Sequence, residues 1–139
     1  MVRLIVGNKG KGKTTEILNR VNTQIKEAKG SIVYLDKSNK HMYELNNKVR
    51  LIDVSRFPIA NSEQFVGFIC GIISQDHDLE AMYLDGFIKC SKVKPEEITE
   101  TIKELDAVSR MFNIEFTISL SLDKEELDSS LEDMILVAL

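Results

Sequence analysis

Short apolar runs alternate along the chain with longer segments in which apolar residues recur at helical spacing. The runs lie at residues 2–6, 32–36, 49–54, 81–85 and 114–120. Their length and continuity are typical of buried strands, and strands that alternate with helices build a largely parallel sheet. The pattern therefore predicts an α/β fold in a single domain over residues 1–139, with a mostly parallel sheet of five or six strands and helices on both faces.

The segments between these runs predict the helices. The first helix is expected to follow the first run after a short loop and to extend to about Lys29, with Gly30 just beyond its end. Asn61 can cap a second helix, and Pro95 can open a third because its missing N–H costs nothing at a helix start. The apolar stretch at 134–139 predicts either a sixth strand or a packed terminal helix.

The loop between the first run and the first helix carries the strongest chemical signal in the sequence. Residues 7–14 read GNKGKGKT, which matches the pattern G-x-x-x-x-G-K-[ST] of a phosphate-binding loop. The motif needs glycines because backbone N–H groups must curl around phosphate oxygens without Cβ clashes, and Gly7, Gly10 and Gly12 permit this. The following helix adds the partial positive charge of its N-terminus. The motif therefore predicts that the chain binds a nucleoside triphosphate.

The side chains of the motif have separate expected roles. Lys13 should reach the β- and γ-phosphates, the Thr14 hydroxyl should ligate Mg²⁺, and Thr15 is placed to touch the α-phosphate. Lys9 and Lys11 either add positive field at the phosphates or are solvated. The expected phosphate-binding set is Gly7, Asn8, Lys9, Gly10, Lys11, Gly12, Lys13, Thr14 and Thr15.

A second expected part of the site is Asp85, which follows four apolar residues. A carboxylate at the carboxyl end of a parallel strand can hold the water shell of magnesium, near the place where such folds bind their ligands. Asp36 and Asp53 also end apolar runs and compete for this role. Thr14 and Asp85 are thus the expected metal ligands, and ATP and Mg²⁺ are the expected cofactors. ATP is favoured over GTP because the chain has no Asn-Lys-x-Asp motif that would read guanine.

Composition and charge narrow the range of partners. The chain has 139 residues, 43% of them hydrophobic, and a formal net charge of −4, so one folded domain is expected and a nucleic-acid-binding surface is not. No apolar stretch reaches the roughly 18 residues of a membrane span, no secretory signal is recognisable, and Cys70 and Cys90 are expected as free thiols. We therefore expect a cytoplasmic protein that binds a nucleoside triphosphate, with a protein partner or a homo-oligomer as an open alternative.

With this loop and this order of strands and helices, nearly the whole chain resembles the P-loop NTPases. The element order looks like the RecA-like core, which occurs in recombinases and in pilus-retraction (twitching-motility) ATPases. The resemblance implies that the fifth strand lies between the first and the fourth. Residues 13–16 (KTTE) are also similar to thymidine kinases, although the zinc-ligand cysteines of those enzymes are missing. The loop is similar to that of partition ATPases too, but the position of their signature lysine is Asn8 here.

The chain departs from these families where catalysis is expected. RecA-type recombinases carry a catalytic glutamate two residues past the aspartate of the second strand, a position occupied here by Ser38. Many related ATPases carry a glutamate directly after the aspartate of the fourth strand, where this chain has Gly86. The resemblance therefore implies a regulatory module or a weak ATPase, without an evident base for the attacking water. Ser119 or Ser121 could supply the sensor residue that usually ends the strand beside the loop.

Two alternatives stay open. In the first, the chain is an active RecA-like ATPase or a small nucleoside-type kinase that completes its site by oligomerisation. The base would then come from Glu16, Asp36, Asp53 or a neighbouring subunit, and an arginine finger from Arg50 or Arg56. In the second, the fold is degenerate, the loop binds no nucleotide, and the domain serves protein interactions.

Overall fold

Six strands form one sheet in the computed structural model, which describes all 139 residues, and every neighbouring pair of strands is parallel. The strands are β1 (Val2–Val6), β2 (Ser31–Asp36), β3 (Arg50–Asp53), β4 (Leu79–Leu84), β5 (Glu115–Leu120) and β6 (Ile135–Ala138). Their order across the sheet is β3-β2-β4-β5-β1-β6. The α/β fold is therefore confirmed, and the apolar stretch near the C-terminus is a sixth strand rather than a helix.

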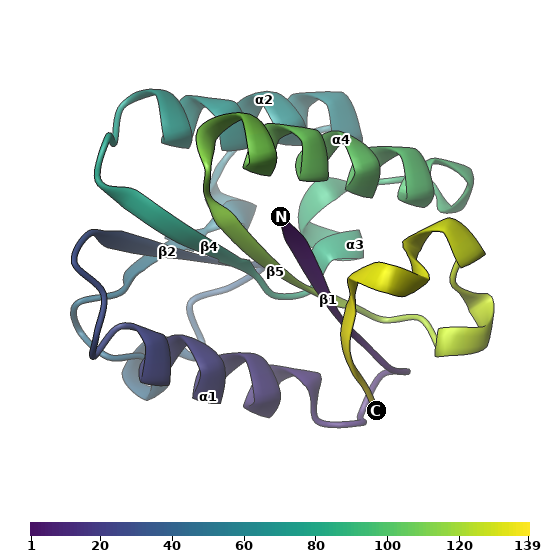
Figure 1. Cartoon of the computed structure of the whole chain (residues 1–139), viewed down its shortest axis with the longest axis horizontal. Helices are drawn as coiled ribbons and strands as arrows, with labels where there is room; N and C mark the ends of the chain where they lie inside the picture. The colour runs from purple at the N-terminus through teal and green to yellow at the C-terminus, as the bar shows by residue number, and fades with distance from the viewer.

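Four α-helices cover the two faces of the sheet unequally. They are α1 (Lys13–Gln24), α2 (Ser62–Ser74), α3 (Phe87–Ser91) and α4 (Ile98–Phe112). Figure 1 shows α2, α3 and α4 together on one face and α1 alone on the other. The face under three helices has a core cluster of 24 buried residues, whereas the face under α1 has a cluster of 10. Part of the α1 face is consequently left for polar side chains.

Burial along the strands explains why their positions can be read from the sequence. The inner strands β2 and β4 are covered on both faces, so they consist of nearly continuous apolar residues. The edge strands β3 and β6 are only partly buried. Five short 3₁₀ helices lie in the connections: η1 (Met42–Glu44), η2 (Val54–Arg56), η3 (Pro95–Glu97), η4 (Lys124–Glu126) and η5 (Ser129–Met134).

Two helix boundaries differ from the prediction. The first helix ends at Gln24 instead of near Lys29, and Gly30 is therefore not its terminal glycine. A Cβ on Gly30 would lie 1.9 Å from the carbonyl oxygen of Asp78, so glycine is needed here for a close approach to the chain entering β4. Pro95 opens η3, and α4 begins only after this turn; the five-residue helix α3 was not predicted at all.

The strand order decides which chain segments meet at the carboxyl edge of the sheet. β5 lies between β1 and β4, as the resemblance to RecA-like cores implies, although membership of that family stays a prediction. The loop after β1, the turn after β4 and the chain leaving β2 therefore emerge at one edge, where ligands of parallel sheets bind.

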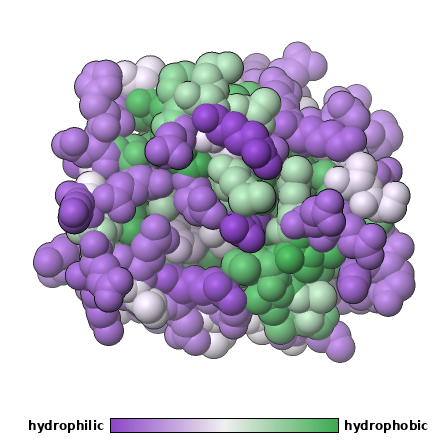
Figure 2. Space-filling view, in the orientation of Figure 1, coloured by the Kyte–Doolittle hydropathy of each residue, from purple (hydrophilic) through white to green (hydrophobic).

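Exposed hydrophobic side chains occupy limited parts of the surface. Figure 2 shows a mainly hydrophilic face with hydrophobic side chains gathered in limited areas. The exposed large apolar residues are Met42, Tyr43, Phe57, Met111, Phe112, Leu136 and Leu139. No helix of the structure has both the length and the apolar character that crossing a bilayer requires.

Candidate functional site

The glycine-lysine loop (residues 7–15) joins β1 to α1 in a conformation that depends on glycine. Gly10 has a φ of 88° and Gly12 a φ of 93°, in the left-handed region that other residues rarely adopt. Gly7 is needed for a different reason, because a Cβ there would lie 3.1 Å from both the Cβ and the carbonyl oxygen of Leu139. Glycine is therefore favoured at Gly10 and Gly12 by the backbone angle and at Gly7 by a close approach to Leu139.

The loop presents a group of backbone donors without acceptors. Within it, Gly7 N–H bonds to Leu122, and Lys11 N–H bonds to the carbonyl of Asn8 at 3.3 Å. The first helical bond of α1 runs from Glu16 N–H to the Gly12 carbonyl at 3.1 Å. The N–H groups that donate to no acceptor of the chain are those of Asn8, Lys9, Gly10, Gly12, Lys13, Thr14 and Thr15. Such donors at the start of a 12-residue helix form an anion-binding arrangement.

Lys13 is the one buried charged side chain of the loop. Its residue is only 8% exposed, and its Nζ donates to the Asn8 carbonyl at 3.1 Å. Burial lowers the pKa of Lys13, and Lys37 adds to this, whereas the negative charge of Asp85 raises it. Lys13 has no carboxylate within ion-pair distance. A buried ammonium without a carboxylate partner is suited to an anionic ligand.

The remaining side chains of the loop are more open. Lys9, Lys11 and Thr15 are exposed, and Thr14 is half-buried. The Thr14 hydroxyl makes no hydrogen bond within the chain, so it is free to meet a ligand. The structure thus separates Lys13, which is fixed, from the two neighbouring lysines, which point into solvent.

Asp85 directly follows β4 and is rigidly held. Its Oδ1 accepts a hydrogen bond from the Ser119 hydroxyl at 2.7 Å, and its Oδ2 accepts one from the Tyr34 hydroxyl at 3.0 Å. Ser119 in turn accepts from the N–H of Gly86 at 2.8 Å. Burial and the nearby charge of Asp85 raise the pKa of Tyr34, so this phenol stays protonated and donates. Each Asp85 oxygen keeps acceptor capacity, because a carboxylate oxygen can take two hydrogen bonds.

The two serines considered as sensors have different positions. Ser119 lies on β5, is 1% exposed and contacts Asp85, whereas Ser121 is exposed beyond the strand and makes no such contact. Only Ser119 is therefore part of the site. Tyr34 was not predicted to be there, because its sequence position indicates a core strand residue and nothing more.

The three carboxylates that could act as a general base have different surroundings in the structure. Glu16 pairs with Arg20 at 2.9 Å, on the α1 face of the sheet. Asp53 accepts from Ser55 N–H at 3.1 Å and from the Ser55 hydroxyl at 2.6 Å, which makes it the cap of η2. Both side chains therefore already have structural roles.

Asp36 is the exception among the three. It ends β2 and is 2% exposed; its Oδ1 accepts from the Lys37 N–H at 2.7 Å, but its Oδ2 is buried without any partner. Burial and the neighbouring charge of Asp85 raise the pKa of Asp36. A buried carboxylate oxygen without a hydrogen-bond partner destabilises the fold. The presence of an aspartate at position 36 is therefore not explained by a contribution to stability.

The two arginines that could serve as an arginine finger, Arg50 and Arg56, both lie in or next to β3. Arg50 pairs with Asp76 at 3.2 Å, whereas Arg56 is exposed and makes no ion pair. Arg56 is thus the one of the two whose guanidinium is free.

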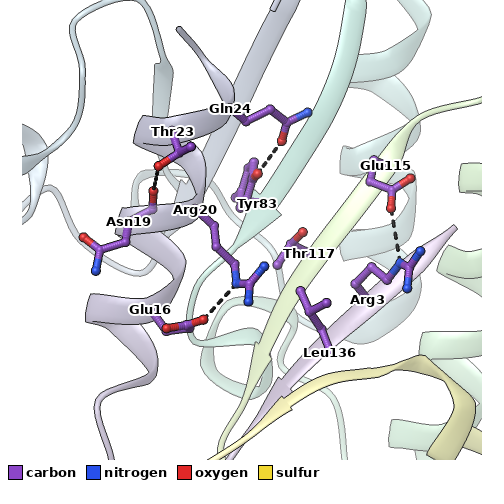
Figure 3. A pocket seen from close by; sticks show the side chains of 10 residues that line it. All are labelled: Arg3, Glu16, Asn19, Arg20, Thr23, Gln24, Tyr83, Glu115, Thr117 and Leu136. Carbon is purple, nitrogen blue, oxygen red and sulfur yellow. Dashed lines mark hydrogen bonds and ion pairs between the residues drawn. The ribbon is translucent and has the colours of Figure 1, made fainter. Parts of the chain in front are cut away.

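A polar groove of about 580 Å³ lies elsewhere, between α1 and the strands of the sheet (Figure 3). Its charged side chains pair with one another: Arg20 with Glu16 at 2.9 Å, and Arg3 with Glu115 at 3.4 Å. Tyr83, whose pKa burial raises to about 12, bonds to Gln24 at its wall. None of the residues expected to bind phosphate lines this groove.

The protein alone offers no complete metal centre. No group of three or more His, Cys, Asp or Glu side chains is arranged to hold an ion. Magnesium does not require such a group, because it commonly binds through one or two protein oxygens, water and substrate phosphate. The spare acceptor capacity of Asp85 and the free Thr14 hydroxyl fit this mode of binding.

Comparison with known proteins gives no independent guide to the function. No protein-family model matches the chain, and no curated protein matches its sequence.

Proposed function

We propose that this protein binds ATP with magnesium through the glycine-lysine loop and acts as a nucleotide-dependent regulatory module that hydrolyses ATP slowly or not at all. The observation that carries the proposal is the row of free backbone N–H groups at the start of α1, beside the buried ammonium of Lys13. Unpaired backbone donors and a buried cation without a carboxylate partner, in one loop, are stabilised by a bound polyanion.

The proposed division of roles follows from the contacts. Lys13 exchanges its weak bond to the Asn8 carbonyl for phosphate oxygens, which are stronger acceptors because they are charged. Thr14 and Asp85 hold Mg²⁺, which neutralises phosphate charge when bound. The hydrogen bonds from Ser119 and Tyr34 keep the Asp85 carboxylate in a fixed orientation for this task. The expected setting is the cytoplasm, where ATP and magnesium are both available.

Slow hydrolysis is expected because the chain lacks an evident general base for the water that would attack the γ-phosphate. Ser38 and Gly86 occupy the positions where related ATPases carry a glutamate, and neither can accept a proton. The only buried carboxylate with a free oxygen is Asp36, which we propose as a weak base. Positioning and electrostatics supply most of the rate in phosphoryl transfer, so low residual turnover is expected.

The test combines ATP binding with phosphate release. Calorimetry with ATP and MgCl₂ should show binding to the wild type that Lys13→Ala abolishes or strongly weakens, while circular dichroism shows the same fold in both. Phosphate release should stay far below 1 s⁻¹, the lower end of the usual range for enzymes. Turnover at or above that rate would refute the regulatory assignment, and absent binding at millimolar ATP would support the degenerate-fold alternative.

A second candidate function is an active ATPase or small kinase whose site is completed by another copy of the chain. The observation that favours it is Arg56, an exposed guanidinium without an ion-pair partner in η2, directly after β3. Specific activity should then rise with protein concentration and should fall in Arg56→Gln. Constant specific activity over a dilution series would exclude a shared site.

A further inference from the structure

A second hollow lies at the carboxyl edge of the sheet, with a volume of about 590 Å³. Lys37, which follows β2, and Lys89 and Lys92, from α3 and its end, line it together with an apolar wall. The wall includes Val54 and Phe57 from the segment after β3 and Ile88 from α3. We call this hollow the lysine pocket. It combines a cationic side with an apolar side, and it contains no carboxylate.

The three lysines of the pocket form no ion pair within the protein: none of the five ion pairs in the molecule includes Lys37, Lys89 or Lys92. The charges of Lys37 and Lys9 are close enough to lower the pKa of Lys89, although Lys89 is fully exposed. Like charges this close repel each other, so a bound anion would relieve this repulsion.

The pocket is also held in shape by its surroundings. The Lys37 side chain lies across Gly86, where a Cβ would be 3.6 Å from the Lys37 Cδ. The thiol of Cys90 donates to the Asp85 carbonyl at 3.3 Å, which ties α3 to the turn after β4. The Phe57 ring rests against Phe68 of α2, with ring centres 5.3 Å apart. Loop, turn and helix are thus tied together around the hollow.

The location of the pocket relates it to the glycine-lysine loop. Along the carboxyl edge, the loop follows β1, Asp85 follows β4, and the pocket begins at Lys37 after β2 and reaches the segment after β3. Asp85 therefore lies between the loop and the pocket. The pocket shares no residue with the loop, so it can take its own ligand.

We propose that the lysine pocket binds a second small molecule, a phosphate monoester on an aromatic or aliphatic body, beside the site of the triphosphate. Three ammonium groups suit the two negative charges of a phosphate monoester. The apolar wall suits an uncharged ring or chain attached to that phosphate. This ligand site goes beyond the proposed function, and it stands even if the glycine-lysine loop binds no ATP.

The test measures binding of 1-naphthyl phosphate by fluorescence and by amide NMR shifts. The double variant Lys37→Gln/Lys89→Gln removes two charges of the pocket without touching its apolar wall. Its matched control is Lys26→Gln/Lys48→Gln. This variant removes two exposed lysines from the connections that lead into β2 and β3, at the amino ends of the strands. We expect the pocket variant to lower the affinity about tenfold or more, and the control to change it less than about twofold. Uncharged 1-naphthol should bind about tenfold more weakly than the phosphate.

Further outcomes decide the proposal. Binding of the probe should be retained in Lys13→Ala, and the amide shifts should centre on Phe57, Ile88 and Lys89. If Lys13→Ala abolishes probe binding, the phosphate occupies the glycine-lysine loop and the proposal is wrong. Equal probe affinity of the wild type and the pocket variant would also overturn the proposal. So would the absence of binding at about 10 mM probe, a concentration that detects even very weak complexes. ATP affinity measured on the same samples reports separately on the proposed function.

Discussion

Two hollows of nearly equal volume differ in the pairing of their charges. In the polar groove on the α1 face, about 580 Å³, each arginine has a carboxylate partner. In the lysine pocket, about 590 Å³, no ammonium has one. The two hollows therefore differ in the pairing of their charges and not in their size.

The difference arises from where the charges sit on the fold. Glu16 and Arg20 are four residues apart on α1, a spacing at which side chains meet on a helix surface. Arg3 and Glu115 meet because β1 and β5 are neighbours in the sheet. At the carboxyl edge, by contrast, the lysines follow strand ends and short turns, and none of them forms an ion pair with the nearby Asp36 or Asp85. The same contrast applies to Lys13, which is buried without a carboxylate.

The largest expected effect compares a charge removal in the glycine-lysine loop with one in the polar groove. Lys13→Gln should lower ATP affinity by about 10- to 100-fold, because a charge-assisted bond to phosphate is worth roughly 1.5–3 kcal/mol. Arg20→Gln, in the polar groove, should leave the affinity unchanged. Calorimetry on both variants checks this pair, and a comparable loss in Arg20→Gln would invalidate the contrast between the regions.

The next effect concerns the support of Asp85. Ser119→Ala should destabilise the fold by about 2 kcal/mol, because the N–H of Gly86 loses its acceptor and Asp85 loses a donor. Ser121→Ala should shift the urea midpoint very little, because that residue is exposed. Urea titration of both variants measures the difference. Equal stability of the two would mean that water replaces the hydroxyl, and that the network does not fix Asp85.

Asp36→Asn should stabilise the fold, in contrast to Ser119→Ala. The pKa of Asp36 is raised by folding, so the native state binds its proton more tightly than the unfolded state does, and stability falls as the pH rises through this range. Removing the carboxylate should raise the melting temperature at pH 7 by about 3 °C, as expected for roughly 1 kcal/mol in a domain of this size. The pH dependence of stability in the acidic range should become flatter. Differential scanning calorimetry from about pH 4, near the ordinary pKa of an aspartate, up to about pH 7 measures both. A lower melting temperature in the variant would show that Asp36 stabilises the fold.

The smallest effect belongs to the polar groove. Arg3→Gln should change the free energy of unfolding by less than about 0.5 kcal/mol, because the Arg3 and Glu115 side chains are 41% and 47% exposed. Urea titration in low salt, where surface ion pairs are strongest, gives the most sensitive measurement. A loss above 1 kcal/mol, the upper end for exposed pairs, would show that pairing in the groove has a larger structural role.

Local patterns made most of the fold predictable. Buried parallel strands are continuous apolar runs, and the loop motif is confined to eight successive residues, so both can be read without knowing the strand order. The five residues of α3 are too few to show a helical period. The predicted end of α1 was wrong because Gly30 is needed for a close approach to Asp78, which is distant in the sequence.

The side-chain environment of the site was less accessible to sequence reasoning. Asp85 and Ser119 could be named as candidates, because both lie at strand ends. The contact of Tyr34 with Asp85 exists because β2 and β4 are neighbours, and the free oxygen of Asp36 is a property of tertiary packing. The lysine pocket combines three chain segments and has no local motif. Whether the loop binds ATP stays a prediction.

The strand pairing of β1 determines when the glycine-lysine loop can take its folded shape during synthesis on the ribosome. Val2 aligns with Phe116 and Leu4 with Ile135, so the strand that anchors the glycine-lysine loop has no neighbour in the sheet until more than a hundred further residues exist. At about 5–20 residues per second, this delay is on the order of 10 s. The helix α1 can coil during that time, but Gly7 lacks its bond to Leu122 and its contact with Leu139. Any ligand of the loop therefore meets a shaped site only after translation has passed the last strand, and an interrupted translation product cannot compete for it.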